Sequence, residues 1–177
     1  MILWRRTFLR ILITCVFICC LLLLVRTSGV ADPHWRTSVG VFAPFDIPRG
    51  VNANAGWTVA VEYTFSTESD AGRQWSGAFR YAHYPLGGGQ SVNLYTPTLD
   101  LRQYLGSVRN GDSLEGWWIG GGLGMLFGDN TAGGHVWHFA YTAAVGFDAR
   151  RLFIEARMVR GTKPGDHGFI ASLGWKW

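Results

Sequence analysis

The chain has 177 residues, of which 48% are hydrophobic and 15% aromatic. All three cysteines lie within the first 20 residues, so the rest of the chain has no disulfides, thiolate metal ligands or cysteine nucleophile. The net charge of +4 also comes from the start of the chain, which excludes it as an indication of nucleic-acid binding.

Residues 1–31 predict a cleaved secretory signal peptide. Three arginines precede an apolar run of 15 residues, from 11 to 25, which is short for a membrane span. Small residues at Gly29 and Ala31 then indicate a cleavage site. An uncleaved membrane anchor is the alternative interpretation. Cleavage removes four arginines and leaves 12 basic and 12 acidic residues.

Eight segments after residue 31 alternate apolar residues with polar or small ones, which is the period-two pattern of a β-strand. In the clearest segment, Trp57, Val59 and Val61 share one face. No segment outside the predicted signal shows a convincing helical period. The predicted strands are 35–44, 56–66, 74–84, 92–105, 117–127, 136–147, 152–160 and 168–177.

The last of these strands indicates a membrane protein. Phe169, Leu173, Trp175 and Trp177 share its apolar face, although no later segment of the sequence could cover the two tryptophans. Membrane barrels carry aromatic girdles at both bilayer interfaces. The 23 glycines, eight tryptophans and two lysines of residues 32–177 suit such a barrel better than a soluble domain. The residues expected in the girdles are Trp35, Trp57, Trp75, Trp175 and Trp177.

The predicted fold is all-β: an eight-stranded antiparallel up-and-down transmembrane β-barrel over residues 32–177. Closure leaves no strand edge unpaired, which lipid requires because it offers no hydrogen bonds. With both chain ends in the periplasm, the tight turn at 148–151 is periplasmic and the loops at 44–55 and 161–167 lie outside. The connection at 105–116 is longer than expected for a periplasmic turn.

The chain resembles the small eight-stranded outer-membrane barrels of the OmpA/OmpX/OmpW-like "outer membrane protein β-barrel domain" family. The resemblance extends over 35–177 and implies a Gram-negative outer-membrane location, with Trp177 in the place of the terminal aromatic residue read by the assembly machinery. The family includes adhesins, anchors, enzymes and narrow channels, so the resemblance specifies architecture rather than activity. It rests on the segments 39–46, 117–128, 145–148, 152–157 and 168–177.

Charged residues on the polar faces of the strands are expected to point into the lumen. Glu62 and Arg80 lie on neighbouring predicted strands. Paired charges that fill a narrow interior are the favoured interpretation, and a gated ion path is the alternative. The predicted luminal charge network consists of Glu62, Arg80, Asp100, Arg102, Glu155, Arg157 and Lys176.

No residue pattern predicts catalysis or cofactor binding. Lipid A deacylases of the outer membrane use a histidine, a serine and a carboxylate, and the segment 153–160 contains neither histidine nor serine. His138 shares a face with Thr142, which is a poor substitute for serine. His135, His138 and His167 do not have the spacing of a known metal site. We therefore expect no enzyme activity, metal or cofactor.

The predicted function is that of an integral outer-membrane barrel with a structural, surface-display or small-molecule permeation role. The expected partners are outer-membrane lipid, lipopolysaccharide and the outer-membrane assembly machinery, with no nucleic acid, and the oligomeric state stays open. A soluble lipocalin-like barrel is one alternative, and a lipid-modifying enzyme is another. The lipocalin alternative requires an apolar interior and a charged exterior, opposite to the predicted faces.

Overall fold

The computed structural model describes residues 34–45, 47, 51–68, 71–110, 113–130, 134–162 and 167–177. Residues 31–177 form one compact unit. The predicted signal peptide lies outside the described residues. In the described part of the chain, no helix is long and apolar enough to cross a membrane.

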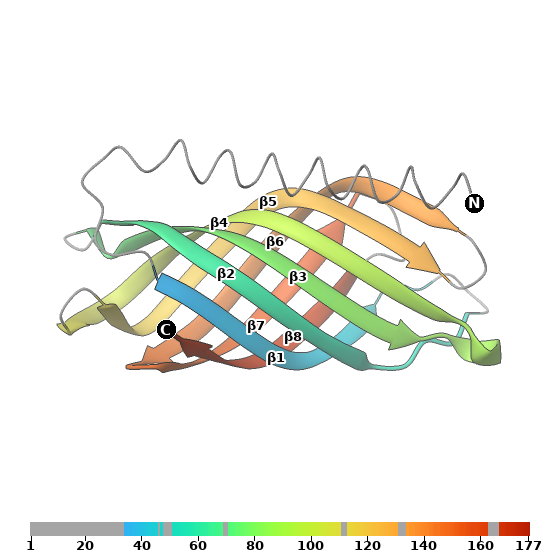
Figure 1. Cartoon of the computed structure of the whole chain (residues 1–177), viewed down its shortest axis with the longest axis horizontal. Helices are drawn as coiled ribbons and strands as arrows, with labels where there is room; N and C mark the ends of the chain where they lie inside the picture. Colours follow the sequence, from blue (N-terminus) through green and yellow to red (C-terminus); the bar gives the residue numbers. More distant parts are fainter. Residues whose placement is uncertain are drawn as a thin grey trace. The chain divides into compact units, whose positions relative to one another are not determined.

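Residues 34–176 form a closed barrel in which every strand is antiparallel to its neighbours (Figure 1). A short 3₁₀ turn, η3 (Gly87–Gly89), lies between the third and fourth strands. The predicted eight-stranded barrel is confirmed. Its strands are β1 (His34–Phe45), β2 (Gly56–Glu68), β3 (Arg73–Pro85), β4 (Ser91–Asn110), β5 (Ser113–Asn130), β6 (His135–Ala149), β7 (Leu152–Gly161) and β8 (His167–Lys176).

The barrel closes where the last strand pairs with the first. Arg36 lies opposite Lys176, and the backbone N–H of Trp177 donates to the carbonyl of Trp35 at 2.9 Å. Figure 1 shows the start of β1 and the C terminus at the same end of the barrel, which we call the terminal end. The opposite end, where β1 connects to β2, is called the loop end.

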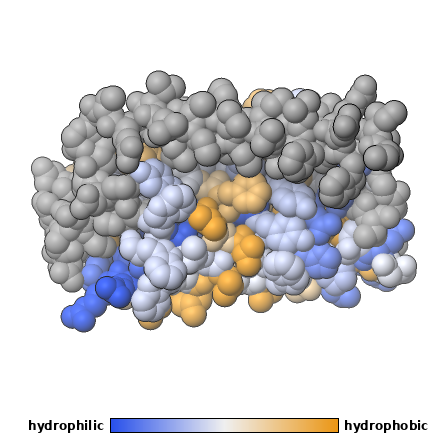
Figure 2. All heavy atoms as spheres, in the orientation of Figure 1, coloured by the Kyte–Doolittle hydropathy of each residue, from blue (hydrophilic) through white to orange (hydrophobic). Residues whose placement is uncertain are grey.

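The outer wall of the barrel is apolar, as the strand pattern predicted. Large side chains from all eight strands are exposed there, including Val61 at 46%, Leu123 at 73% and Phe139 at 70%. Figure 2 shows such residues gathered over the middle of the visible wall, with hydrophilic residues toward the ends. Because most charged residues that the alternation turns inward are buried, the faces have the polarity of a membrane barrel.

The connection predicted at 105–116 is wrong. β4 continues to Asn110 and β5 begins at Ser113, which leaves residues 111–112 between them. The β4–β5 register shifts between Leu105 and Val108, and Gly106 has a φ of 66°. This bulge interrupts the alternation of side chains, so the sequence pattern stops before the strand does.

The side-chain rings of Trp118 and Phe153 fit into the lumen because each lies beside a glycine on a neighbouring strand. Gly146 lies opposite Trp118, and a Cβ built on this glycine would overlap the indole. Gly174 lies opposite Phe153 in the same relationship. The narrow lumen therefore pairs large side chains with positions that have none.

Candidate functional site in the barrel lumen

The lumen holds a set of buried charged side chains that we call the luminal network. Among the residues that the structure describes, it contains four arginines and four carboxylates from six strands, none more than 8% exposed. Buried charges are costly unless they are paired, and here the two signs balance. The members are Arg36, Glu62, Arg80, Asp100, Arg102, Asp148, Glu155 and Arg157.

Asp148 accepts the largest set of hydrogen bonds in the network. The guanidinium of Arg36 donates to both of its oxygens, at 2.9 and 3.1 Å. The hydroxyl of Tyr104 and the indole N–H of Trp118 each donate at 2.8 Å. The ammonium of Lys176 lies 3.4 Å away. The carboxylate therefore ties together β1, β4, β5 and β8 from its position on β6.

A second cluster occupies the middle of the barrel around Asp100. Arg80 donates to Asp100 at 2.7 Å and, through its other terminal nitrogen, to the hydroxyl of Thr98 at 2.7 Å. Arg157 approaches the same oxygen of Asp100 at 2.9 Å and also donates to Glu155. Each guanidinium thus spans two acceptors, a geometry that fixes side-chain position as well as charge.

Glu62 connects the two groups of charges. Its shortest contact is with Arg102, and its oxygens lie 3.8 Å from Arg36 and 3.9 Å from Arg80. The sequence placed Glu62 and Arg80 on neighbouring strands, and the structure brings them together only at this longer distance. The nearest carboxylate to Arg80 is Asp100.

Two arginines of the network also stack on aromatic rings. The guanidinium carbon of Arg36 lies 3.9 Å from the ring centre of Phe153, and that of Arg102 lies 4.8 Å from the ring centre of Trp118. Such cation–π contacts stabilise a guanidinium that has been removed from water. Aromatic side chains therefore close the spaces between the charges.

The part of the lumen toward the loop end is mostly apolar, although Thr58 and His138 face inward there, opposite Ala82 and Leu126. There, the rings of Phe42 and Tyr84 stack with their centres 5.3 Å apart, and Leu126 is fully buried. This cluster, which we call the apolar plug, lies inside the barrel and not on its wall. Its buried members are Phe42, Ala82, Tyr84, Leu94, Leu126, Ala140, Val159 and Ile170.

Six of the seven residues predicted for the lumen are buried in the luminal network. The seventh, Lys176, is largely buried at the terminal end, beside Asp148. Sequence reasoning missed Arg36 and Asp148. Since Trp35 was assigned to the outer face, strict alternation would have turned Arg36 inward. Asp148 was assigned to the turn, whereas β6 continues one residue beyond it.

The predicted girdle tryptophans lie on the outer wall. Trp35, Trp175 and Trp177 are exposed at the terminal end, and Trp75 is partly buried at the same end. Trp57 is exposed at the loop end, where its ring packs 5.1 Å from that of Tyr81. Tryptophan therefore lies at both ends of the outer wall, at levels that we call the two tryptophan belts.

The histidines do not form an evident catalytic or metal site in the described part of the chain. His138 is buried inside the barrel, His167 is buried at the loop end where its ring stacks on that of Phe45, and His135 is exposed. Thr142, which shares a face with His138, accepts a hydrogen bond from Arg157 at 2.9 Å. No group of three or more histidine, cysteine or acidic side chains among the described residues could hold a metal ion.

Comparison with known proteins relates the chain to others by fold. No protein-family model and no curated protein matches its sequence. The crystal structure of Ail, the attachment invasion locus protein of Yersinia pestis, is similar with a TM-score of 0.56 and 13% identity, over 83% of this chain and all of that one. The outer-membrane protein OprG of Pseudomonas aeruginosa has a TM-score of 0.49 and 13% identity, over 84% of this chain and 96% of that one.

A third similar structure, Neisserial surface protein A, has a TM-score of 0.49 and 7% identity, over 82% of this chain and 98% of that one. At these identities the likeness shows the fold alone. The chain thus has the fold of small bacterial outer-membrane β-barrels. This fold agrees with the outer-membrane localisation expected from the sequence.

Proposed function

We propose that the protein is an integral outer-membrane β-barrel that is closed to ions and serves as a rigid scaffold for the connections at its loop end. The observation that carries this proposal is the filling of the lumen. Charged pairs occupy its middle and terminal parts, and the apolar plug, with the buried Thr58 and His138 beside it, fills the part toward the loop end. A permeation role would require a continuous polar path, which the apolar plug interrupts.

The closed lumen is supported at several levels along the barrel. Asp100 and Ser76, which lie opposite each other on β4 and β3, are both inaccessible to solvent. Trp118 on β5 and Leu126, eight residues further along the same strand toward the loop end, are also inaccessible. Solvent thus fails to reach the side chains at each of these levels, as expected for a barrel of eight strands.

The surface-display part of the proposal rests on the unequal connections at the two ends. At the terminal end the connections are 69–72, 111–112 and 150–151, whereas the loop end has 46–55, 86–90, 131–134 and 162–166. Outer-membrane barrels have short periplasmic turns and longer outer loops. The terminal end would therefore face the periplasm and the loop end the exterior.

Two partner classes follow from this placement as proposals. The apolar wall between the tryptophan belts would contact outer-membrane lipid and, in the outer leaflet, lipopolysaccharide. The assembly machinery would recognise β8 and its terminal Trp177, as the family resemblance implies. Neither class requires an opening into the lumen.

Conductance across planar lipid bilayers tests the closed lumen. The refolded residues 32–177 should give no stepwise conductance. The double variant Phe42→Ala, Leu126→Ala, measured in the same way, should show whether loss of the apolar plug alone opens a path for ions. Reproducible conductance steps from the unmodified barrel would refute the closed scaffold and favour permeation.

Labelling of peptide tags in intact cells tests the orientation. A tag inserted between Gly88 and Gly89, where neither glycine has a neighbour within 4 Å of an added Cβ, should bind antibody without permeabilising the cells. A tag inserted between residues 111 and 112 should bind antibody only after permeabilisation. The reverse result would show that the loop end faces the periplasm.

A further inference from the structure

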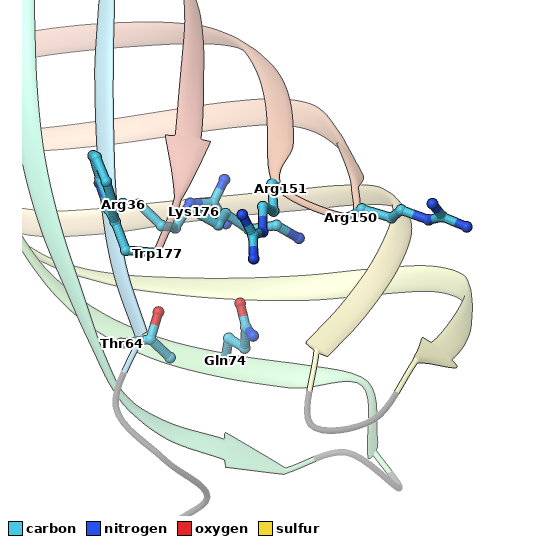
Figure 3. A pocket seen from close by; sticks show the side chains of 7 residues that line it. All are labelled: Arg36, Thr64, Gln74, Arg150, Arg151, Lys176 and Trp177. Carbon is cyan, nitrogen blue, oxygen red and sulfur yellow. The ribbon is translucent and has the colours of Figure 1, made fainter.

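A cationic pocket opens at the terminal end of the barrel. It has a volume of about 170 Å³, and seven residues line it (Figure 3). Four of the seven carry positive charge, and none is a carboxylate side chain: the cations are Arg36, Arg150, Arg151 and Lys176. The pocket lies outside the luminal network except for Arg36, which belongs to both.

The cations of the pocket differ in whether a carboxylate of the barrel already neutralises their charge. Arg36 is committed to Asp148 through two hydrogen bonds, and Lys176 lies 3.4 Å from the same carboxylate. Arg150 and Arg151 are exposed, and among the described residues no carboxylate side chain forms an ion pair with either. The exposed arginines therefore leave positive charge available to a ligand.

The backbone holds one of these arginines in place. The N–H of Lys176 donates to the carbonyl of Arg151 at 2.7 Å, which fixes the start of β7 against the end of β8. Figure 3 shows Arg151, Lys176 and Arg36 gathered on one side of the pocket, with Thr64 and Gln74 across from them. The hydroxyl and amide add neutral hydrogen-bonding groups to a cationic wall, an arrangement that suits a phosphate group.

The turn that carries the arginines has an unusual backbone. Arg150 has a φ of 45°, and it is the one non-glycine residue of positive φ in the described chain. Glycine, asparagine and aspartate are the residues favoured at such a turn position. An arginine in this unfavourable conformation, next to a second arginine, indicates that the positive charge at this turn has a binding role.

The position of the pocket selects the source of the phosphate. Trp177 lines it and is 73% exposed, and Trp175 lies on the adjoining outer wall. Tryptophan belts lie at the level of lipid headgroups. We infer that the pocket binds the phosphate of an anionic phospholipid headgroup, such as phosphatidylglycerol, in the leaflet that surrounds the terminal end. Basic pockets on membrane proteins bind headgroups of this kind.

Native mass spectrometry of the folded barrel of residues 32–177, released from detergent micelles, tests this inference. The samples contain phosphatidylglycerol or phosphatidylcholine, with or without inorganic phosphate as a competitor. We expect preferential retention of phosphatidylglycerol, and about tenfold weaker retention in Arg151→Gln, because one charge-assisted contact is lost. The side chain of Arg151 is exposed, and heat-modifiable gel migration verifies that the variant is folded.

The matched control is Arg73→Gln, because Arg73 is an exposed arginine at the same end of the barrel but outside the pocket. This variant should retain phosphatidylglycerol as the unmodified barrel does. Equal retention of the two lipids, or equal loss in both variants, would overturn the site. Competition by inorganic phosphate without retention of phosphatidylglycerol would overturn the lipid source and leave only a site for free phosphate.

Discussion

Arg36 and Asp148 form a bidentate ion pair that joins the first strand to the sixth across the lumen, with N–O distances of 2.9 and 3.1 Å. The strands that carry them are not neighbours in the barrel. The pair therefore braces the wall across its interior, in a direction that the backbone ladder does not cover. Tyr104 and Trp118 extend the brace to β4 and β5.

Replacement of Asp148 by asparagine should destabilise the barrel by about 3–5 kcal/mol, because it removes the bidentate partner of Arg36 and leaves only Glu62, 3.8 Å away, as its counter-charge. Urea unfolding in lipid vesicles measures the change. The control is Glu68→Gln, since Glu68 and Arg73 form an exposed pair at 3.9 Å and should contribute less than about 1 kcal/mol. Similar losses of unfolding free energy in the two variants would show that the Arg36–Asp148 pair stabilises the barrel no more than an exposed ion pair does.

Replacement of Val61 by arginine should destabilise folding into bilayers by about 2–4 kcal/mol, because Val61 faces outward near the middle of β2. Vesicle refolding at a series of urea concentrations gives the free energy. If Val61→Arg folds as well as the unmodified protein in water without detergent, the apolar wall does not face lipid.

Replacement of the adjacent Glu62 by glutamine should act through the lumen instead. Its closest partner is Arg102, so the loss should be smaller in an Arg102→Met background than in the unmodified protein. A double-mutant cycle of these two positions in the same vesicle assay measures the coupling. Additive losses would contradict the contact.

Removal of Trp177, or its change to lysine, should lower the amount of folded barrel in the outer membrane. The residue is exposed in the belt of the terminal end, and its indole N–H lies 3.3 Å from the hydroxyl of Thr37. Heat-modifiable gel migration of outer-membrane fractions measures the effect, and Trp57→Lys at the other belt separates a local role from a general loss of aromatic surface. An unchanged amount of folded protein would refute the expectation.

Replacement of Gly146 by valine should cost about 1–3 kcal/mol, because the added side chain would overlap the Trp118 indole. The same urea assay measures it. Trp118→Phe in the same molecule should recover part of the loss by freeing space, although it also removes the indole donor to Asp148. If the double variant recovers no stability, the overlap with Trp118 is not the cause of the loss.

The strands could be predicted because apolar and polar residues alternate along each one. This pattern can be recognised in a single segment, without knowing which other strands pair with it. The same alternation assigned Glu62 and Asp100 to the interior. It carries no information on height within the barrel, which is fixed by the register between strands. Arg80 therefore has Asp100 as its nearest carboxylate and not the expected Glu62.

The errors occur where a strand departs from regular alternation or continues through an expected turn. The bulge beyond Leu105 concealed the extension of β4, and assignment of Asp148 to a turn concealed the most heavily bonded carboxylate of the lumen. The cationic pocket was equally beyond prediction. It is formed by β1, β2, β3, β8 and the β6–β7 turn, which only the closed register brings together.

The pairing of β8 with β1 also constrains the order of folding. The side chains of Thr37 and Trp177, which meet across this seam, are 140 positions apart in the chain. Contacts between such distant positions form late, because the intervening chain must first be ordered. Until they form, β1 and β8 each present an unpaired edge, which lipid does not tolerate. Entry into the bilayer and closure of the seam are therefore coupled, and the arrival of β8 sets their timing.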